Sequence, residues 1–518
     1  MEDEMADFIA SRLEEDTNAA IETNFLERQD AIVLWKKGPK KWNQWVAKHR
    51  SWGVDLTYFD FAEFAGLEGE EVSFAGYRFP SGNINFRGSK FSGRKIDFSR
   101  AVFFGSVVFE DCQFDSEKYD FSRSEFHCGV VFRSTQFGEG QLDFSRAIFG
   151  HDIIFDDVTL VGGDAFFYSI QHKSGVFRFN EVKFGDGHVC FKGAGFKGES
   201  LDFKSVDFCD GVVSFEGCHF GLPVAFDYSR FGDGELSFED AIINSRVFSA
   251  KRCRFSGVVD FSPNKIASQC DSISFAGSDF QSDLSLRGLS SPVPVDLRNA
   301  SINRDIDLSG VRMDFKKISL GEKRKIDERN PFRDDVLAVG GSQSWFKPLG
   351  FLSCAKHRED SAKFRRLKMI ARDGEDHVRA LSFYASEVRC GYWHSIRGVD
   401  RRLFFFYDLL SNFGQSFLRP VLALFFTVLA FACMYALISS SLFPYSPVLF
   451  TDAVLLSLSH TFPFYPAGRE MRPIVVSRLF DGIDGVSDLY FILSLAQNIL
   501  SITLLFFLIL ALRNLYRS

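Results

Sequence analysis

Large apolar side chains return at a short, nearly fixed interval between Phe74 and Leu308. A first series recurs every 11 or 12 residues: Phe74, Phe86, Phe98, Phe109, Phe121, Phe132, Phe144, Phe155, Phe167, Phe179, Phe191, Phe203, Phe215, Phe226 and Phe238. A second series trails the first by five residues: Phe79, Phe91, Phe103, Phe114, Phe126, Phe137 and Phe149, then Phe184, Phe196, Phe208, Phe220 and Phe231. Because neither helical nor strand periodicity gives this spacing, the pattern predicts a solenoid of stacked repeats. The stretch 246–269 interrupts both series.

Small side chains stand two positions before the second series: Ala101, Cys112, Ser124, Thr135, Ala147, Ala194 and Cys218. The unit Ser99-Arg100-Ala101-Val102-Phe103 resembles the pentapeptide repeat, in which a small residue precedes Leu or Phe by two positions. That resemblance implies a four-sided (quadrilateral) β-helix with about 23 residues per coil and coils about 4.8 Å apart. We therefore expect a β-solenoid over residues 71–310, with about ten coils.

Two uncharged apolar runs lie near the C-terminus, at Val421–Leu442 and Leu489–Leu512. Each is long enough to cross a bilayer as a helix, and we expect both to be transmembrane, with Tyr435 and Tyr490 as interface anchors. Basic residues flank both runs on their outer sides, and the first twenty residues lack the basic and apolar regions of a secretory signal. The prediction is a multi-pass protein of the inner (cytoplasmic) membrane with both termini in the cytoplasm.

The regions beside the solenoid are predicted to be helical. Residues 1–70 are expected to form an N-terminal cap, with an acidic amphipathic helix over 1–36 and Trp42 and Trp45 closing the first coil. Residues 311–417 form a basic juxtamembrane linker; residues 311–419 hold 22 Lys and Arg against 14 Asp and Glu, whereas residues 74–310 hold 25 basic and 32 acidic residues.

Within the linker, Ser361–Ala371 and Val378–Val388 predict a helical hairpin. The stretch Phe364–Arg389, together with Tyr407–Pro420, resembles the membrane-proximal segment of bacterial pentapeptide-repeat membrane proteins. The linker therefore leads into a membrane domain that we place at residues 418–518.

The loop between the two spans is the first candidate site. A short apolar helix within residues 449–464 is expected to begin near Thr451 or Asp452, and span, re-entrant helix and span in this order are similar to the pore domain of two-helix potassium channels. The filter sequence of those channels is missing after Thr461, which puts potassium selectivity in doubt. The alternative is a short interfacial helix that covers the end of the bundle. The candidate pore-loop residues are Thr451, Asp452, His460, Thr461, Phe462, Pro463 and Phe464.

Polar residues inside the second span form the second candidate site: Gln497, Asn498 and Ser501. Polar groups at such positions usually face protein or water. They would line a conducting path, or their amides would hydrogen-bond between helices and hold an oligomer together. Both interpretations require more than one subunit, so a homo-oligomer is expected.

Enzyme chemistry finds no support in the sequence. Gly193–Gly198 matches a dinucleotide-binding glycine pattern by letter but falls on repeat corners without a strand-to-helix context. No cysteine pair or histidine pair has metal-ligand spacing, and the ten scattered cysteines are expected to be reduced core residues. The chain is predicted to be non-enzymatic, with no cofactor and no metal.

Three functions of different classes remain. The favoured one is an oligomeric membrane effector or ion-channel-like protein whose cytoplasmic β-helix senses or recruits a protein partner, an arrangement similar to bacterial stress or antiviral effectors. The second is a membrane-tethered interaction scaffold without conductance. The third is an acidic DNA mimic, which the small acidic excess and the membrane anchor disfavour, and nucleic acid is an unlikely partner.

Overall fold

The computed structural model describes residues 24–61, 71–319, 353–392, 394–395, 398–440, 447–462, 466–480 and 488–516. Residues 1–23 of the predicted acidic helix lie outside this part of the chain, as do Pro463 and Phe464. Two compact units are present, Met1–Lys316 and Lys317–Ser518. Each has its own interior.

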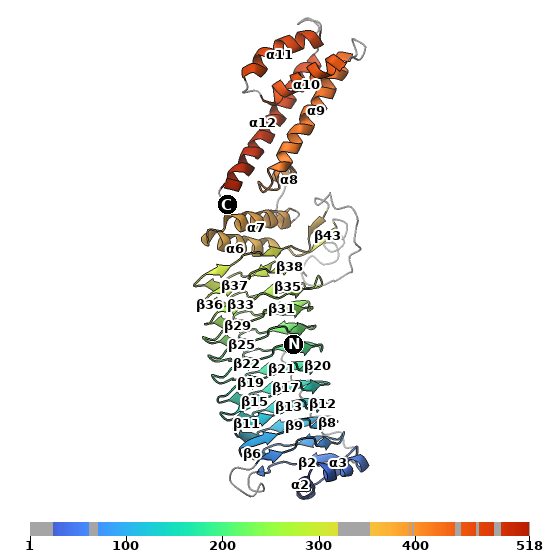
Figure 1. Ribbon diagram of the computed structural model, residues 1–518, viewed down its shortest axis with the longest axis vertical. Coiled ribbons are helices and arrows are strands. Elements are labelled where there is room, and N and C mark those ends of the chain that lie inside the picture. Colours follow the sequence, from blue (N-terminus) through green and yellow to red (C-terminus); the bar gives the residue numbers. More distant parts are fainter. Residues whose placement is uncertain are drawn as a thin grey trace. The chain divides into compact units, whose positions relative to one another are not determined.

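The first unit is a β-solenoid of about eleven coils, and most coils contribute one short strand to each of four parallel sheets (Figure 1). The first sheet comprises β1 (Phe25–Leu26), β2 (Gly53–Asp55), β5 (Ile84–Asn85), β9 (Val107–Glu110), β13 (Val130–Arg133), β17 (Ile153–Asp156), β21 (Val176–Asn180), β24 (Ser200–Asp202), β27 (Val224–Ala225), β31 (Val247–Ser249), β35 (Ser272–Ser274) and β39 (Val295–Asp296). The second comprises β3 (Val72–Ser73), β7 (Lys95–Asp97), β11 (Lys118–Asp120), β15 (Gln141–Asp143), β19 (Ala165–Phe166), β22 (Val189–Cys190), β25 (Val213–Ser214), β29 (Leu236–Ser237), β33 (Val259–Asp260), β37 (Leu284–Ser285) and β41 (Ile306–Asp307).

The other two faces are less continuous. The third comprises β4 (Arg78–Phe79), β8 (Val102–Phe103), β12 (Glu125–Phe126), β16 (Ile148–Phe149), β20 (Gln171–His172), β23 (Gly195–Phe196), β26 (His219–Phe220), β30 (Ile242–Ile243) and β34 (Lys265–Ile266), then the pair β38 (Ser290–Ser291) and β42 (Arg312–Met313). The fourth comprises β6 (Lys90–Ser92), β10 (Gln113–Asp115), β14 (Gln136–Phe137) and β18 (Thr159–Leu160), then β28 (Arg230–Phe231), β32 (Arg254–Phe255), β36 (Asp279–Phe280) and β40 (Ser301–Ile302). The stretch 246–269 that interrupts the phenylalanine series continues the coil through β31 to β34.

Stacked phenylalanines fill the interior, as the spacing predicts. Phe98, Phe121 and Phe144 occupy equivalent positions in three successive coils, with ring centroids 4.8 and 4.7 Å apart and nearly parallel planes. Strand register repeats after 23 residues, for example between Asp97 and Asp120. Each buried phenylalanine contributes on the order of 2–3 kcal/mol of transfer free energy, so the rings stabilise the stack along its length.

Backbones approach one another closely at a corner that glycine occupies in successive coils: Gly187, Gly211, Gly234 and Gly257. A Cβ atom built on Gly211 would lie 1.9 Å from the carbonyl oxygen of Gly187. At Gly211 a side chain would therefore require the neighbouring backbone to move.

Several cysteines fill small interior positions, and no disulfide joins cysteines in the part of the chain that the structure describes. Cys112 and Cys253 are buried, and burial raises the pKa of each thiol to about 12. These thiols are core side chains.

Two helices, α2 (Arg28–Lys36) and α3 (Pro39–Lys48), cover the first coil. Trp42 is fully buried and its indole Nε1 donates to the carbonyl of Arg78 at 2.8 Å. Trp35 stacks on Phe74, with ring centroids 5.3 Å apart. Trp45 packs against His49 and Trp52 of the cap itself.

The second unit is mainly helical. It contains β43 (Lys317–Ser319), which pairs antiparallel with β44 (Ser353–Ala355), and seven labelled helices: α6 (Asp360–Asp373), α7 (His377–Gly391), α8 (Gly398–Ser411), α9 (Leu418–Ser440), α10 (Pro447–Thr461), α11 (Pro466–Leu479) and α12 (Asp488–Tyr516). Helices α6 and α7 form the predicted hairpin, and the Asp376 side chain caps α7 by accepting from the Arg379 amide. Helices α9 and α12 are long and apolar enough to cross a membrane.

Candidate functional site in the C-terminal bundle

Helices α9, α10, α11 and α12 form a bundle with α10 packed on both long helices. Its apolar core comprises Ala432, Tyr435, Ala453, Leu456, Val475, Leu479, Phe480 and Tyr490. The opposite faces of α9 and α12 are apolar and exposed, for example at Phe426 and Ile509. The polar side chains of the candidate site lie inside the bundle, next to this core.

Gln497 is the centre of the buried polar group. Its side chain is fully buried, its Oε1 accepts from the Tyr435 hydroxyl at 2.8 Å, and its Nε2 donates to the Ser457 carbonyl at 2.8 Å. The same Nε2 lies 2.7 Å from Ser457 Oγ and 3.1 Å from Thr461 Oγ1. One glutamine thus ties α12 to both α9 and α10.

These bonds lie within one chain. Hydrogen bonding of the Gln497 amide therefore does not require a second subunit, in contrast to the interpretation in which this amide holds an oligomer together. The expectation for the two tyrosines is also wrong, because Tyr435 and Tyr490 are buried in the bundle core and do not lie at its surface.

Three polar atoms near this network have no hydrogen-bond partner among the described residues: His460 Nδ1, Asn498 Oδ1 and Ser501 Oγ. The His460 ring lies 3.3 Å from the Tyr490 hydroxyl through its Nε2, and the Asn498 side chain lies beside it. Both His460 and Ser501 are almost completely buried. Unsatisfied polar groups at such depth are costly and are usually satisfied by ordered water.

Helix α11 contributes arginines that bind α10. Arg472 donates through Nη2 to the Ser459 carbonyl at 2.6 Å, near the C-terminal end of α10. Arg478 Nη1 lies 3.9 Å from the buried carboxylate of Asp452. A cation at a helix C-terminus interacts favourably with the helix dipole, so Arg472 helps to hold α10 in place.

The candidate pore-loop residues therefore have different environments. Asp452, His460 and Thr461 are buried on α10, whereas Thr451 and Phe462 are exposed. The helix runs from Pro447 to Thr461, several residues longer than the apolar run at its centre.

The buried face of α12 changes character along its length. Ser494, Gln497 and Ser501 lie in the half that packs on α10, and Leu504 and Ala511 continue the same buried face toward the C-terminal end. Toward its own N-terminal end, α9 buries Pro420, Leu424 and Thr427, whose hydroxyl donates to the Ala423 carbonyl of the same helix. The interior is thus mainly apolar in this half.

A junction of hydrogen bonds connects the hairpin to the ends of the two long helices. Arg389 of α7 donates to Asp408 of α8 through Nε at 3.0 Å and through Nη2 at 2.5 Å. Gln415 Nε2, in the segment before α9, donates to the Leu381 carbonyl of α7 at 3.1 Å. Asn514 Nδ2, near the end of α12, donates to the Gly414 carbonyl at 3.3 Å.

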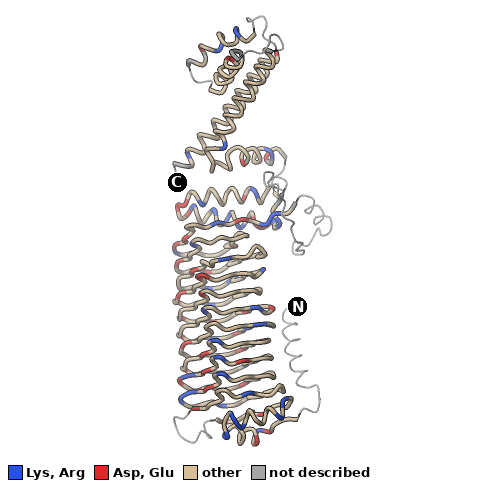
Figure 2. Tube along the Cα trace, turned by 45° about the vertical axis from the view of Figure 1, so that its right-hand side comes forward, with Lys and Arg blue, Asp and Glu red and all other residues tan. Residues whose placement is uncertain are grey.

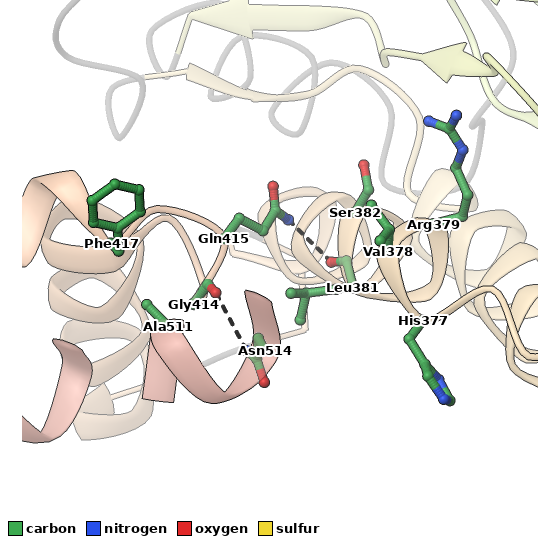
Figure 3. Close-up of a pocket in the computed structure, with 10 residues that line it drawn as sticks. All are labelled: His377, Val378, Arg379, Leu381, Ser382, Gly414, Gln415, Phe417, Ala511 and Asn514. Atoms are coloured by element: carbon green, nitrogen blue, oxygen red, sulfur yellow. Dashed lines mark hydrogen bonds between the residues drawn. The ribbon is translucent and has the colours of Figure 1, made fainter. Parts of the chain in front are cut away.

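A cavity of about 620 Å³ opens at this junction (Figure 3). Its lining comes from α7, from the segment before α9 and from the end of α12: His377, Val378, Arg379, Leu381, Ser382, Gly414, Gln415, Phe417, Ala511 and Asn514. In Figure 3 the side chains of Arg379 and His377 point in opposite directions, so they do not converge on one ligand. The lining therefore does not form a single charged binding site.

Sequence reasoning missed the partners of Gln497, namely Tyr435 and Ser457, and also Arg472. The signal in the sequence was a polar residue within each apolar helix. The sequence does not show which of these residues pair, because that depends on how α10 packs. Comparison of the chain with protein-family models, with curated proteins and with solved structures found no match.

Proposed function

We propose that this protein is an oligomeric, channel-like membrane effector. Helices α9 and α12 cross the cytoplasmic membrane, both chain ends lie in the cytoplasm, and the β-solenoid detects or recruits a protein partner. The observation that carries the proposal is the junction: Gln415, in the segment before α9, donates to α7 of the hairpin, and Asn514 bonds the end of α12 to that same segment. A displacement of the hairpin would therefore pull on both spans.

The two halves of the bundle interior support a gate. The half that contains His460, Asn498 and Ser501 has unsatisfied polar atoms and suits water, whereas the half next to the junction buries Leu504 of α12 and Leu424 of α9. Apolar constrictions block ions because water withdraws from them. The structure corresponds to the closed state in this proposal, and movement at the junction would open this apolar half to water.

The resemblances in the sequence are compatible with this role. The solenoid repeats resemble pentapeptide repeats, and the order of span, short helix and span is similar to potassium-channel pore domains. Because the filter sequence is absent, we propose no potassium selectivity. Several copies would be needed to enclose a continuous path, since two spans cannot surround a pore.

The membrane potential of bacteria that express the full chain tests the proposal, with a voltage-sensitive dye as the readout. Leu504→Ser places a hydroxyl in the apolar half and should depolarise the cells more than the intact chain does. Ile509→Ser is the matched control, because Ile509 is 66% exposed on the outer face of α12. A variant truncated before Ser411 should cause no depolarisation.

The second candidate is a membrane-tethered scaffold. It is favoured by the Gln497 network, which satisfies its amide inside one chain and leaves it unavailable to ions. If Leu504→Ser reaches the membrane and leaves the potential unchanged, conduction is wrong and the scaffold becomes the better proposal.

A further inference from the structure

Three arginines occupy the same corner of the solenoid in successive coils: Arg100, Arg123 and Arg146. This corner lies between the second and third sheets, and the amides of Arg100 and Arg123 donate to the Ser122 and Ser145 carbonyls of the next coil. The coils here are 4.8 and 4.7 Å apart, measured between the stacked rings two residues earlier. We call these three side chains the arginine row.

The arginine row carries uncompensated positive charge. All three side chains are exposed, and within the described ranges no hydrogen bond or ion pair involves them. The nearest acidic column, one strand earlier, is already engaged, because its carboxylates accept from backbone amides and pair with Lys95 and Lys118. Its members are Asp97, Asp120 and Asp143. Glu125, on the following strand, faces His127 at 3.4 Å.

The backbone does not require arginine at this corner. The three residues have φ of 55°, 57° and 61°, in the left-handed region that favours glycine, and Gly76, Gly193 and Gly217 occupy the same corner in other coils. Like charges so close together repel one another. Three arginines in a row therefore point to an anionic occupant.

Positive charge continues from the row onto the cap. Asn43 of α3 donates to the carbonyl of Gly76, which precedes Arg100 in the same corner column. Lys40 lies one turn before Asn43, and Lys40 and Lys41 are both exposed. Figure 2 shows Lys and Arg gathered on these cap helices.

The chain itself contains a segment of opposite charge. Residues 1–23 hold eight Asp and Glu and one Arg, and they join the described chain just before β1, at the capped end of the solenoid. From β1 to the coil that contains Arg146 is a distance of about 19 Å along the stack, at about 4.8 Å per coil. Twenty-three residues span about 35 Å even at helical rise, so the segment reaches the whole row.

We propose that residues 1–23 bind in the same molecule along the arginine row and the cap lysines. The contacts are ion pairs between side-chain carboxylates and guanidinium or ammonium groups at an exposed surface, so the interaction weakens with salt. Because the segment is tethered, its effective concentration at the row is on the order of millimolar, which excludes weaker anionic competitors.

A dye-labelled peptide of residues 1–23 tests the proposal by fluorescence anisotropy with the detergent-solubilised protein. A chain truncated before Asn24 should bind the peptide in 50 mM salt. The intact chain should bind it at least about tenfold more weakly, because its own segment competes for the row. Raising the salt to 0.5 M should weaken binding to the truncated chain by at least about tenfold.

Charge reversal locates the site. In the truncated chain, the triple variant Arg100→Glu, Arg123→Glu and Arg146→Glu should lose peptide binding, and the milder triple change to Gln should weaken it. The matched control reverses Arg230, Arg252 and Arg254, which lie on the fourth sheet and at the corner before it, and should bind as the parent does. Circular dichroism of each variant verifies that the solenoid is folded.

Two results would overturn the proposal. One is peptide binding that the row variants leave unchanged. The other is no binding of the peptide while a single-stranded oligonucleotide binds the row, which would assign it to an external polyanion. Neither result depends on the membrane potential measured with Leu504→Ser, so this proposal and the channel-like function can fail independently of each other.

Discussion

His172 stands where the other coils of the third sheet place an apolar ring or chain. Its register partners are Phe149 and Phe196, and Phe177 packs edge-on against all three rings. The imidazole is 1% exposed and neither ring nitrogen has a hydrogen-bond partner among the described residues. Burial lowers the pKa of His172, so it stays neutral in the folded solenoid while the unfolded chain titrates near 6.5.

We predict that His172→Phe stabilises the solenoid. The change removes two unsatisfied polar atoms, a gain on the order of 1–3 kcal/mol, and it also removes an acid-sensitive group. Below pH 6.5 the unfolded parent chain binds a proton that the folded chain does not, so the parent loses stability as the pH falls toward the folded-state pKa. The melting temperature at pH 7.5 and pH 5 measures both effects.

His219→Phe is the control for this prediction, because His219 lies exposed on β26. It should leave the acid dependence unchanged. A parent-like acid dependence in His172→Phe would contradict the account of His172.

The corner glycines act together as an element of the solenoid. Gly187, Gly211 and Gly234 let each coil approach the backbone of the coil before it, and a Cβ on Gly211 or Gly234 would lie about 2 Å from a carbonyl oxygen. Backbone cannot move aside as a flexible side chain does. The close approach therefore leaves no room for a side chain at these three positions.

We predict that Gly211→Ala destabilises the solenoid by about 1–3 kcal/mol, the usual range for forcing extra volume into a packed site. Denaturant unfolding followed by circular dichroism measures the loss. Gly195→Ala is the matched control and should change stability little, because its Cβ would meet its nearest neighbour at 3.9 Å. Equal effects of the two changes would show that the corner is more adaptable than its geometry indicates.

The Gln497 network is the corresponding element of the C-terminal bundle. We predict that Gln497→Leu destabilises the bundle by about 1–3 kcal/mol, because the Tyr435 hydroxyl and the Thr461 hydroxyl lose buried partners. Asn498→Leu should cost less, since Gln497 alone bonds to both α9 and α10. Thermal stability of the two variants in one detergent compares them, and the opposite order would contradict this assignment.

At the scale of the whole molecule, two units with separate interiors lie in one chain. We predict two unfolding transitions in denaturant. Gly211→Ala should shift only the transition that loses β-signal, and Gln497→Leu only the one that loses helical signal, because sites without shared partners act additively. A single cooperative transition shifted by both changes would contradict this prediction.

The regular parts of the molecule could be predicted from the sequence because they repeat. Stacked phenylalanines such as Phe98 and Phe121 carry the period directly, and the apolar length of α9 is visible without a structure. The interior of the bundle could not be predicted, because Gln497 meets Ser457 only after α10 folds back onto α12. Tyr435 illustrates the same limit. An aromatic residue in an apolar helix predicts a membrane-interface anchor until the structure shows that its hydroxyl binds Gln497.

The distance between successive coils of the solenoid is nearly constant. Adding one coil inserts 23 residues and lengthens the solenoid by about 4.8 Å, while the phenylalanine rings on either side keep the same neighbours. Internal duplication could therefore change the reach of this protein in equal increments without redesigning its core. Chains with more or fewer coils would then differ first in the length of surface that the solenoid presents, and only afterwards in the chemistry of that surface.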